Sequence, residues 1–164
     1  RASATYHREI LIMYARLLLA FMLLMLSGIG MAEDGFKLRD TSGKVQRLSD
    51  YKGKWVLVNY WATWCPPCLE EVPDLVNLHD QRHKRDLAVI GVAWEYKNPA
   101  EVAHFVDDML MSYPIVLGDA EVAAQIGPNT VLPTTYFYNP QGQLVKVKRG
   151  LVTRAFIESV VSGK

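Results

Sequence analysis

The stretch NYWATWCPPCLEEVP, residues 59–73, contains both cysteines of a chain of 164 residues. Only two prolines separate Cys65 from Cys68, so a disulfide between them would close a loop too short to restrict the unfolded chain appreciably. The pair therefore suits chemistry better than structural support. Two kinds of chemistry use this spacing: half of a metal site, and a disulfide that forms and breaks during a reaction.

The residues on either side of the cysteines predict a strand followed by a helix. Residues 55–62, WVLVNYWA, are nearly all apolar and rich in β-branched and aromatic side chains, which is typical of a central strand buried on both faces. A helical period begins at Pro66, and proline is well tolerated at the first helical position. Glu70, Glu71 and Asp74 are predicted to lie off the buried stripe of this helix. The stripe consists of Cys68, Val72, Leu75 and Val76.

The remaining segments predict an α/β fold with a mixed central sheet. Residues 87–94, LAVIGVAW, are typical of a second buried strand, and the order strand, helix, strand implies a right-handed parallel crossover. The other predicted elements are a hairpin over residues 36–50, a helix around Val102 to Met109, a short strand at 115–117, a brief helix capped by Asp119, a hairpin formed by TTYFY and LVKVKR, and a last helix capped by Thr153.

The first 32 residues are typical of a secretory signal. The unbroken apolar run from Leu17 to Leu26 follows Arg16, and small residues follow at Gly30 and Ala32. We expect cleavage after Ala32. The alternative is an uncleaved anchor, because Ile10 to Met31 approaches the roughly 20 residues that a membrane span needs.

Met13 opens a compact positive segment before the apolar run, so we expect it to be the true start, with residues 1–12 upstream of it. Residues 33–164 then form one domain in the periplasm or another exported location, either released or anchored to the inner membrane. The chain has 18 Lys and Arg against 17 Asp and Glu, so nucleic acid is not an expected partner.

Cys65 falls between the end of the predicted strand and the start of the predicted helix. A helix N-terminus carries about half a positive charge, and such sites lower the pKa of a cysteine from about 8.5 to roughly 3.5–7.5. Cys65 is therefore the predicted nucleophile. Cys68 lies one turn deeper on the buried stripe, which suits a resolving cysteine that attacks a mixed disulfide formed by Cys65.

A zinc site would need two further Cys or His ligands at short spacing. No third cysteine exists, and His79 and His83 begin roughly 16 Å beyond Cys68 along the same helix. The remaining metal alternative is copper held by the two sulfurs and the distant His104. We expect no metal, and we expect all three histidines at solvated helix positions.

Three motifs resemble the thioredoxin fold: WCPPC after an apolar strand, Pro73 five residues beyond the second cysteine, and LPTT at residues 132–135 before a strand. The segments NYWATWCPPCLEEVP, GVAWE and VLPTTYFYNPQGQLV resemble the exported TlpA/ResA-like, or DsbE/CcmG-like, branch of thiol-disulfide oxidoreductases. This branch includes cytochrome c maturation factors. The resemblance covers about residues 36–161, and residues 99–126 are similar to its strand-plus-helix insert before the cis-proline strand.

The resemblance implies a substrate surface around the disulfide. Pro133 resembles the family's cis-proline, which leaves the backbone of Leu132 free to pair with an extended substrate. Trp64, Pro66 and Pro67 are expected to complete the contact surface.

The resemblance also implies a buried acid. Asn59 stands where many thioredoxins have a buried aspartate, and Glu95 matches a glutamate that serves this area in the ResA-like branch. We therefore expect Glu95 to lie under the disulfide and to accept the proton of Cys68.

The expected function is exported thiol-disulfide exchange, with the protein as a reductant of protein disulfides such as those of apocytochrome c. The Cys65–Cys68 disulfide would serve without a further cofactor, and an exported reductant would need electrons from a membrane partner. The alternative is a redox-inactive or copper-handling binding module. A peroxidase is disfavoured, because the motif that surrounds a peroxidatic cysteine in thioredoxin-like peroxidases is absent.

Overall fold

The computed structural model describes Arg16 and residues 35–163. The predicted signal or anchor over residues 1–32, and the predicted start at Met13, fall outside the described residues except for Arg16, and they remain predictions. Within the described part of the chain, none of the helices combines the length and the apolarity that crossing a bilayer requires.

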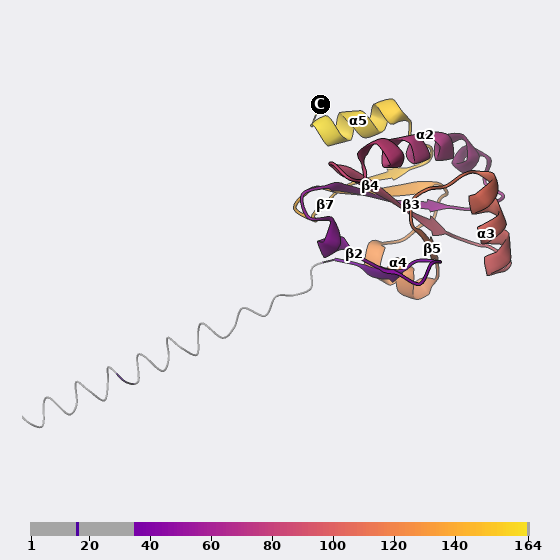
Figure 1. Cartoon of the computed structure of the whole chain (residues 1–164), viewed down its shortest axis with the longest axis horizontal. Helices are drawn as coiled ribbons and strands as arrows, with labels where there is room; N and C mark the ends of the chain where they lie inside the picture. Colours follow the sequence, from indigo (N-terminus) through magenta and orange to yellow (C-terminus); the bar gives the residue numbers. More distant parts are fainter. Residues whose placement is uncertain (1–15, 17–34, 164) are drawn as a thin grey trace, which may run out of the picture. The chain divides into compact units, whose positions relative to one another are not determined.

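Residues 35–163 contain a mixed five-stranded sheet with the strand order β5-β4-β3-β6-β7 (Figure 1). The first three strands of this order run parallel, whereas β6 is antiparallel to β3, and β7 is antiparallel to β6. The predicted mixed sheet is confirmed. The strands are β3 (Trp55–Trp61), β4 (Leu87–Ala93), β5 (Ile115–Leu117), β6 (Thr134–Tyr138) and β7 (Leu144–Arg149).

Helices connect the parallel strands, as the sequence predicts. The helix α2 connects β3 to β4, and α3 connects β4 to β5. The pair β5 and α4 forms the predicted insert before β6, and a small antiparallel hairpin, β1 with β2, precedes the central sheet. The bounds are β1 (Lys37–Arg39), β2 (Val45–Arg47), the 3₁₀ helix η1 (Leu48–Tyr51), α2 (Pro66–Arg82), α3 (Pro99–Asp108), α4 (Ala120–Ile126) and α5 (Arg154–Ser162).

Alternation of side chains along β3 gives the domain a core on each face of the sheet. Leu57 and Trp61 belong to the core under α2 and α5, whereas Val58 and Tyr60 belong to the core on the side of α4 and the hairpin. Figure 1 shows α2 and α5 together on one face of the sheet and α4 with the hairpin on the other. β3 is buried on both faces, which explains its continuous apolar sequence.

Side-chain caps set the starts of the shorter helices. Asp119 accepts a hydrogen bond from Val122 N at 2.8 Å, and Thr153 accepts one from Phe156 N at 3.2 Å, which confirms both predicted caps. The long helix α2 continues through Pro73 to Arg82.

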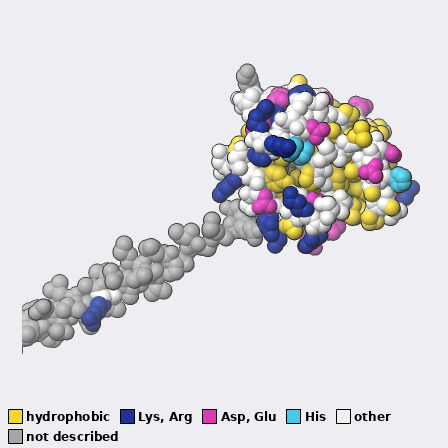
Figure 2. Space-filling view, in the orientation of Figure 1, with side chains coloured by type: hydrophobic (Ala, Val, Ile, Leu, Met, Phe, Trp, Pro, Cys, Tyr) yellow, Lys and Arg dark blue, Asp and Glu magenta, His cyan; other side chains and the backbone are white. Residues whose placement is uncertain are grey.

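Apolar side chains reach the surface of the domain between charges of both signs (Figure 2). Large apolar side chains with more than a third of their surface exposed include Trp64, Leu69, Leu110, Val131, Leu144 and Val145. Three of these, Trp64, Leu69 and Val131, belong to the two segments that carry the predicted site.

The prediction that His79 is solvated is wrong. Gly91 N donates to Pro114 O, so Val89 N, two residues earlier, points to the same edge of β4. The strand β5 pairs only with residues from Gly91 onward, so it cannot accept from Val89. His79 Nδ1 takes this place at 3.1 Å, and burial lowers the pKa of His79 to about 4.

Replacing His79 with alanine is expected to lower the free energy of unfolding at pH 7 by about 1–3 kcal/mol, because Val89 N then has no acceptor. In the native protein the low pKa of His79 means that the unfolded chain takes up a proton first as the pH falls from about 6.5 towards about 4. The free energy of unfolding of the native protein therefore falls as the pH drops through this range, and that of His79→Ala should fall less. Urea titrations at pH 7 and pH 5 measure both effects, with the exposed His104→Ala as the control; equal losses from the two variants would contradict this role for His79.

Candidate active site

The two cysteines form a disulfide at the end of β3, where the chain enters α2. Cys65 is the N-cap residue, and the backbone N–H groups of Cys68 and Leu69 both donate to its carbonyl oxygen. The partial positive charge of the helix end therefore lies at Cys65, as predicted. Both cysteines are buried, with Cys65 3% exposed and Cys68 0% exposed, so the expected contrast in exposure is small in the oxidised protein.

Pro66 and Pro67 occupy the first two positions of α2. A helix leaves its first N–H groups without partners, and proline has no N–H to leave unpaired. The two prolines thus allow the helix to begin directly after Cys65, which places Cys68 one turn into the buried face.

The segment before β6 lies beside the disulfide. The Leu132–Pro133 bond is cis, as the sequence predicts, and Leu132 packs against the core cluster that contains both cysteines. The pairing of Tyr60 with Thr134 places Pro133 at the end of β3 from which the cysteines follow. Among the described residues, none makes a hydrogen bond to the backbone of Leu132.

The prediction that Glu95 lies under the disulfide is wrong. Glu95 is exposed on the loop after β4, with a φ of 53°. Its backbone carbonyl, not its carboxylate, contacts the active-site loop, because it accepts a hydrogen bond from Trp64 Nε1 at 3.4 Å. The chain leaves the sheet at Ala93, two residues earlier, so the side chain of Glu95 no longer follows the buried face of β4.

The buried acid is Glu71, which the sequence prediction placed off the buried stripe. Glu71 is 1% exposed; one carboxylate oxygen accepts from Asn59 Nδ2 at 2.6 Å and the other from Val152 N at 2.8 Å. Burial raises the pKa of Glu71 to about 7, against the opposing effect of the two hydrogen bonds. The spacing could have revealed it, because Glu71 lies three residues after Cys68 and four before Leu75, on the face that both share.

Glu71 thus stands one turn behind Cys68, inside the same core. With a pKa about 7, its carboxyl group changes its protonation state near neutral pH. This is the property that a proton acceptor for a buried thiol needs.

A second carboxylate holds the active-site loop from outside. Glu101, near the start of α3, accepts from Thr63 Oγ1 at 2.6 Å and from Lys97 N at 2.9 Å. The hydrogen bond from Thr63, followed by that from Lys97, lowers the pKa of Glu101. The loop before Cys65 and the loop after β4 are therefore joined through one side chain.

No three His, Cys, Asp or Glu side chains in the described part of the chain gather closely enough to hold a metal ion together. His79 is engaged by Val89 N near the far end of α2. The disulfide remains the chemical feature to be explained.

Comparison with known proteins agrees with this geometry. A family model described as "AhpC/TSA family" matches residues 29–147. The thiol-disulfide oxidoreductase ResA of Bacillus subtilis is 34% identical over 127 residues, which is 77% of this chain and 70% of ResA. Two solved structures have TM-scores of 0.71 and 26% identity: a thiol:disulfide interchange protein of Chlorobium tepidum, covering 78% of this chain and 91% of that one, and a secreted thiol-disulfide isomerase of Corynebacterium glutamicum, covering 77% and 81%.

Proposed function

Because the chain belongs to the AhpC/TSA family and is a thiol-disulfide oxidoreductase with the thioredoxin fold, we propose that it acts outside the cytoplasm as a reductant of protein disulfides. The observation that carries the proposal is the Cys65–Cys68 disulfide at the start of α2, with Cys65 at the N-cap and Glu71 behind Cys68.

In the reduced protein, the Cys65 thiolate attacks one sulfur of a substrate disulfide and forms a mixed disulfide, and the other substrate sulfur leaves as a thiolate. Cys68 then loses its proton to Glu71, attacks Cys65 and releases the second substrate sulfur as a thiolate. The substrate gains two electrons, and the protein is left with the Cys65–Cys68 disulfide. Proton uptake by the two substrate thiolates completes the exchange.

The substrate is expected to bind across the segments that flank the disulfide. Trp64, Pro66 and Pro67 lie on one side, and the backbone of Leu132, which no described residue engages, lies with Pro133 on the other. An extended polypeptide could pair with that backbone as an added strand. The exposed side chains of Trp64 and Val131 offer apolar contact on both sides.

The reducing direction rests on the family resemblance and on the compartment, and the exported location rests on the predicted signal and on the relatives. One structural neighbour is described as secreted. A reductant in an oxidising compartment needs electrons from outside it, so a membrane protein is the proposed donor. Apocytochrome c, with its two cysteines, is the proposed substrate.

Redox titration of residues 33–164 against glutathione and dithiothreitol buffers tests this function, together with the rate at which the reduced protein reduces insulin. We expect the dithiol to be a stronger reductant than glutathione and to reduce insulin. If the two cysteines form their disulfide only in strongly oxidising buffers, the protein acts in the opposite direction, as an oxidant.

Two parallel assays cover the alternatives. Copper titration of the reduced protein tests the binding module, and consumption of hydrogen peroxide tests the peroxidase. Tight copper binding without insulin reduction, or rapid peroxide consumption, would replace the proposed function.

A further inference from the structure

The surface of the domain contains a cavity of about 750 Å³ that the thiol chemistry does not use. It lies where three loops meet: the loop after β4, the loop after β5, and the segment that leads into Leu132 and Pro133. The first of these loops is hydrogen-bonded to the active-site loop through Trp64 Nε1 and the carbonyl oxygen of Glu95. The cavity is thus linked to the active-site loop through Glu95 and to the Leu132 segment through Thr130, so a polypeptide that extends from the disulfide along these loops would reach it.

The lining of the cavity combines aromatic rings with negative charge. Trp94 and Tyr96 contribute the rings, and Glu95 and Asp119 contribute carboxylates. No lysine or arginine is among the residues that line it. Asp119 also caps α4, so part of its charge is offset by the helix end, whereas Glu95 forms no ion pair with a described residue.

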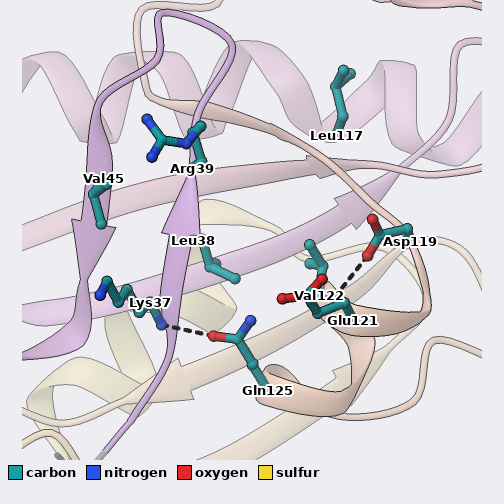
Figure 3. Close-up of a pocket in the computed structure, with 9 residues that line it drawn as sticks. All are labelled: Lys37, Leu38, Arg39, Val45, Leu117, Asp119, Glu121, Val122 and Gln125. Atoms are coloured by element: carbon teal, nitrogen blue, oxygen red, sulfur yellow. Dashed lines mark hydrogen bonds between the residues drawn. The ribbon is translucent and has the colours of Figure 1, made fainter.

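A second cavity, of about 540 Å³, shows the contrast (Figure 3). Asp119 and Glu121 line it together with Lys37 and Arg39, so acidic and basic side chains balance there. Figure 3 also shows Gln125 engaged with the backbone N–H of Lys37. Of these two cavities, the one lined by Trp94 and Tyr96 has carboxylates and aromatic rings without a basic side chain.

We propose that the cavity beside Trp94 and Tyr96 binds a lysine or arginine side chain of the substrate polypeptide, close in sequence to its reacting cysteine. Aromatic faces and carboxylates both attract such a cation. This inference rests on the proposed function and adds the substrate class: basic segments around a disulfide.

Synthetic peptides test the inference. Each peptide carries one cysteine as a mixed disulfide with a small thiol, and a lysine, alanine or glutamate at each position from four before to four after the cysteine. The measured quantity is the second-order rate constant of exchange with the reduced protein. At low ionic strength we expect the best lysine peptide to react about three- to tenfold faster than its alanine counterpart, and the difference to shrink in high salt.

The ratio of the lysine rate to the alanine rate is then compared between variants, so that any general effect on exchange cancels. Glu95→Gln is expected to reduce the ratio to about half or less, because it removes the exposed carboxylate. Glu121→Gln makes the same charge change at the other cavity, and the ratio should stay as in the unmodified protein.

A binding experiment tests the cavity separately from the proposed function. Peptides with serine in place of cysteine are added to ¹⁵N-labelled oxidised protein, and the lysine peptide should shift the Trp94 indole resonance more than the alanine peptide does. Exchange without any lysine preference, a preference that survives Glu95→Gln, or equal indole shifts would overturn the cavity assignment. If no peptide exchanges at all, the proposed function fails, while the indole shifts still decide the cavity.

Discussion

Replacing Cys68 with serine is expected to convert the protein from a catalyst into a trap. Cys65 lies at the N-cap of α2 and retains its place, so the first attack on a substrate disulfide still occurs. The sulfur that would release the product is gone, and substrates remain attached to Cys65 as mixed disulfides. Turnover in the insulin assay should fall to the uncatalysed rate, while non-reducing electrophoresis of the exported fraction should show adducts that mass spectrometry can identify.

The matched variant is Cys65→Ser, which should lose turnover equally and trap little. Both substitutions remove the same disulfide, so a difference between them cannot come from the loss of that cross-link. Equal trapping by both variants would contradict the assignment of Cys65 as the attacking cysteine. Adducts with haem-attachment sequences would support apocytochrome c as a substrate.

Replacing Glu71 with glutamine is expected to slow the second step. With a pKa about 7, the carboxyl group of Glu71 is mostly ionised at pH 8 and can accept the proton of Cys68. The variant should resolve mixed disulfides about a hundredfold more slowly at pH 8, at the lower end of the range for general acid–base catalysis. Stopped-flow rates across pH 5–9 should show an inflection near pH 7 that the variant lacks.

The same substitution should stabilise the protein at high pH. Between about pH 4.5 and about pH 7 the native protein keeps a proton on Glu71 that the unfolded chain has lost, so stability falls as the pH rises through this range. The loss is on the order of 3 kcal/mol, because each unit of pKa corresponds to about 1.4 kcal/mol. Glu71→Gln should therefore unfold at higher urea than the unmodified protein at pH 8, with little difference at pH 4.5.

The hydrogen-bond partners of Glu71 can also accommodate a glutamine at this position. The side-chain oxygen of Asn59 has no partner among the described residues. If the side-chain amide of Asn59 flips, this oxygen can accept a hydrogen bond from the side-chain amide of the new glutamine. The glutamine oxygen can then accept from Val152 N. Glu70→Gln is the control, because Glu70 is the exposed neighbour on the same helix. A pH profile of Glu71→Gln that matches that of Glu70→Gln would show that Glu71 does not act on the thiol.

The sequence by itself determined the elements and the reacting pair. The apolar run of residues 55–62, the helical period after Pro66 and the caps at Asp119 and Thr153 are local patterns, and each predicted element formed where its pattern lies. The Cys65–Cys68 spacing is equally local. Backbone propensity and side-chain periodicity act over a few residues, so they can be read without knowing the fold.

Only the tertiary structure decided which polar side chains are buried and what they face. Glu71, rather than Glu95, stands behind Cys68, because α2 turns it onto Asn59 and Val152 while the chain leaves the sheet before Glu95. Val89 N donates to the buried His79, because β5 is too short to pair with Val89. A buried polar group needs a specific partner, and these partners lie between 10 and 81 residues away along the chain, where no local pattern can indicate them.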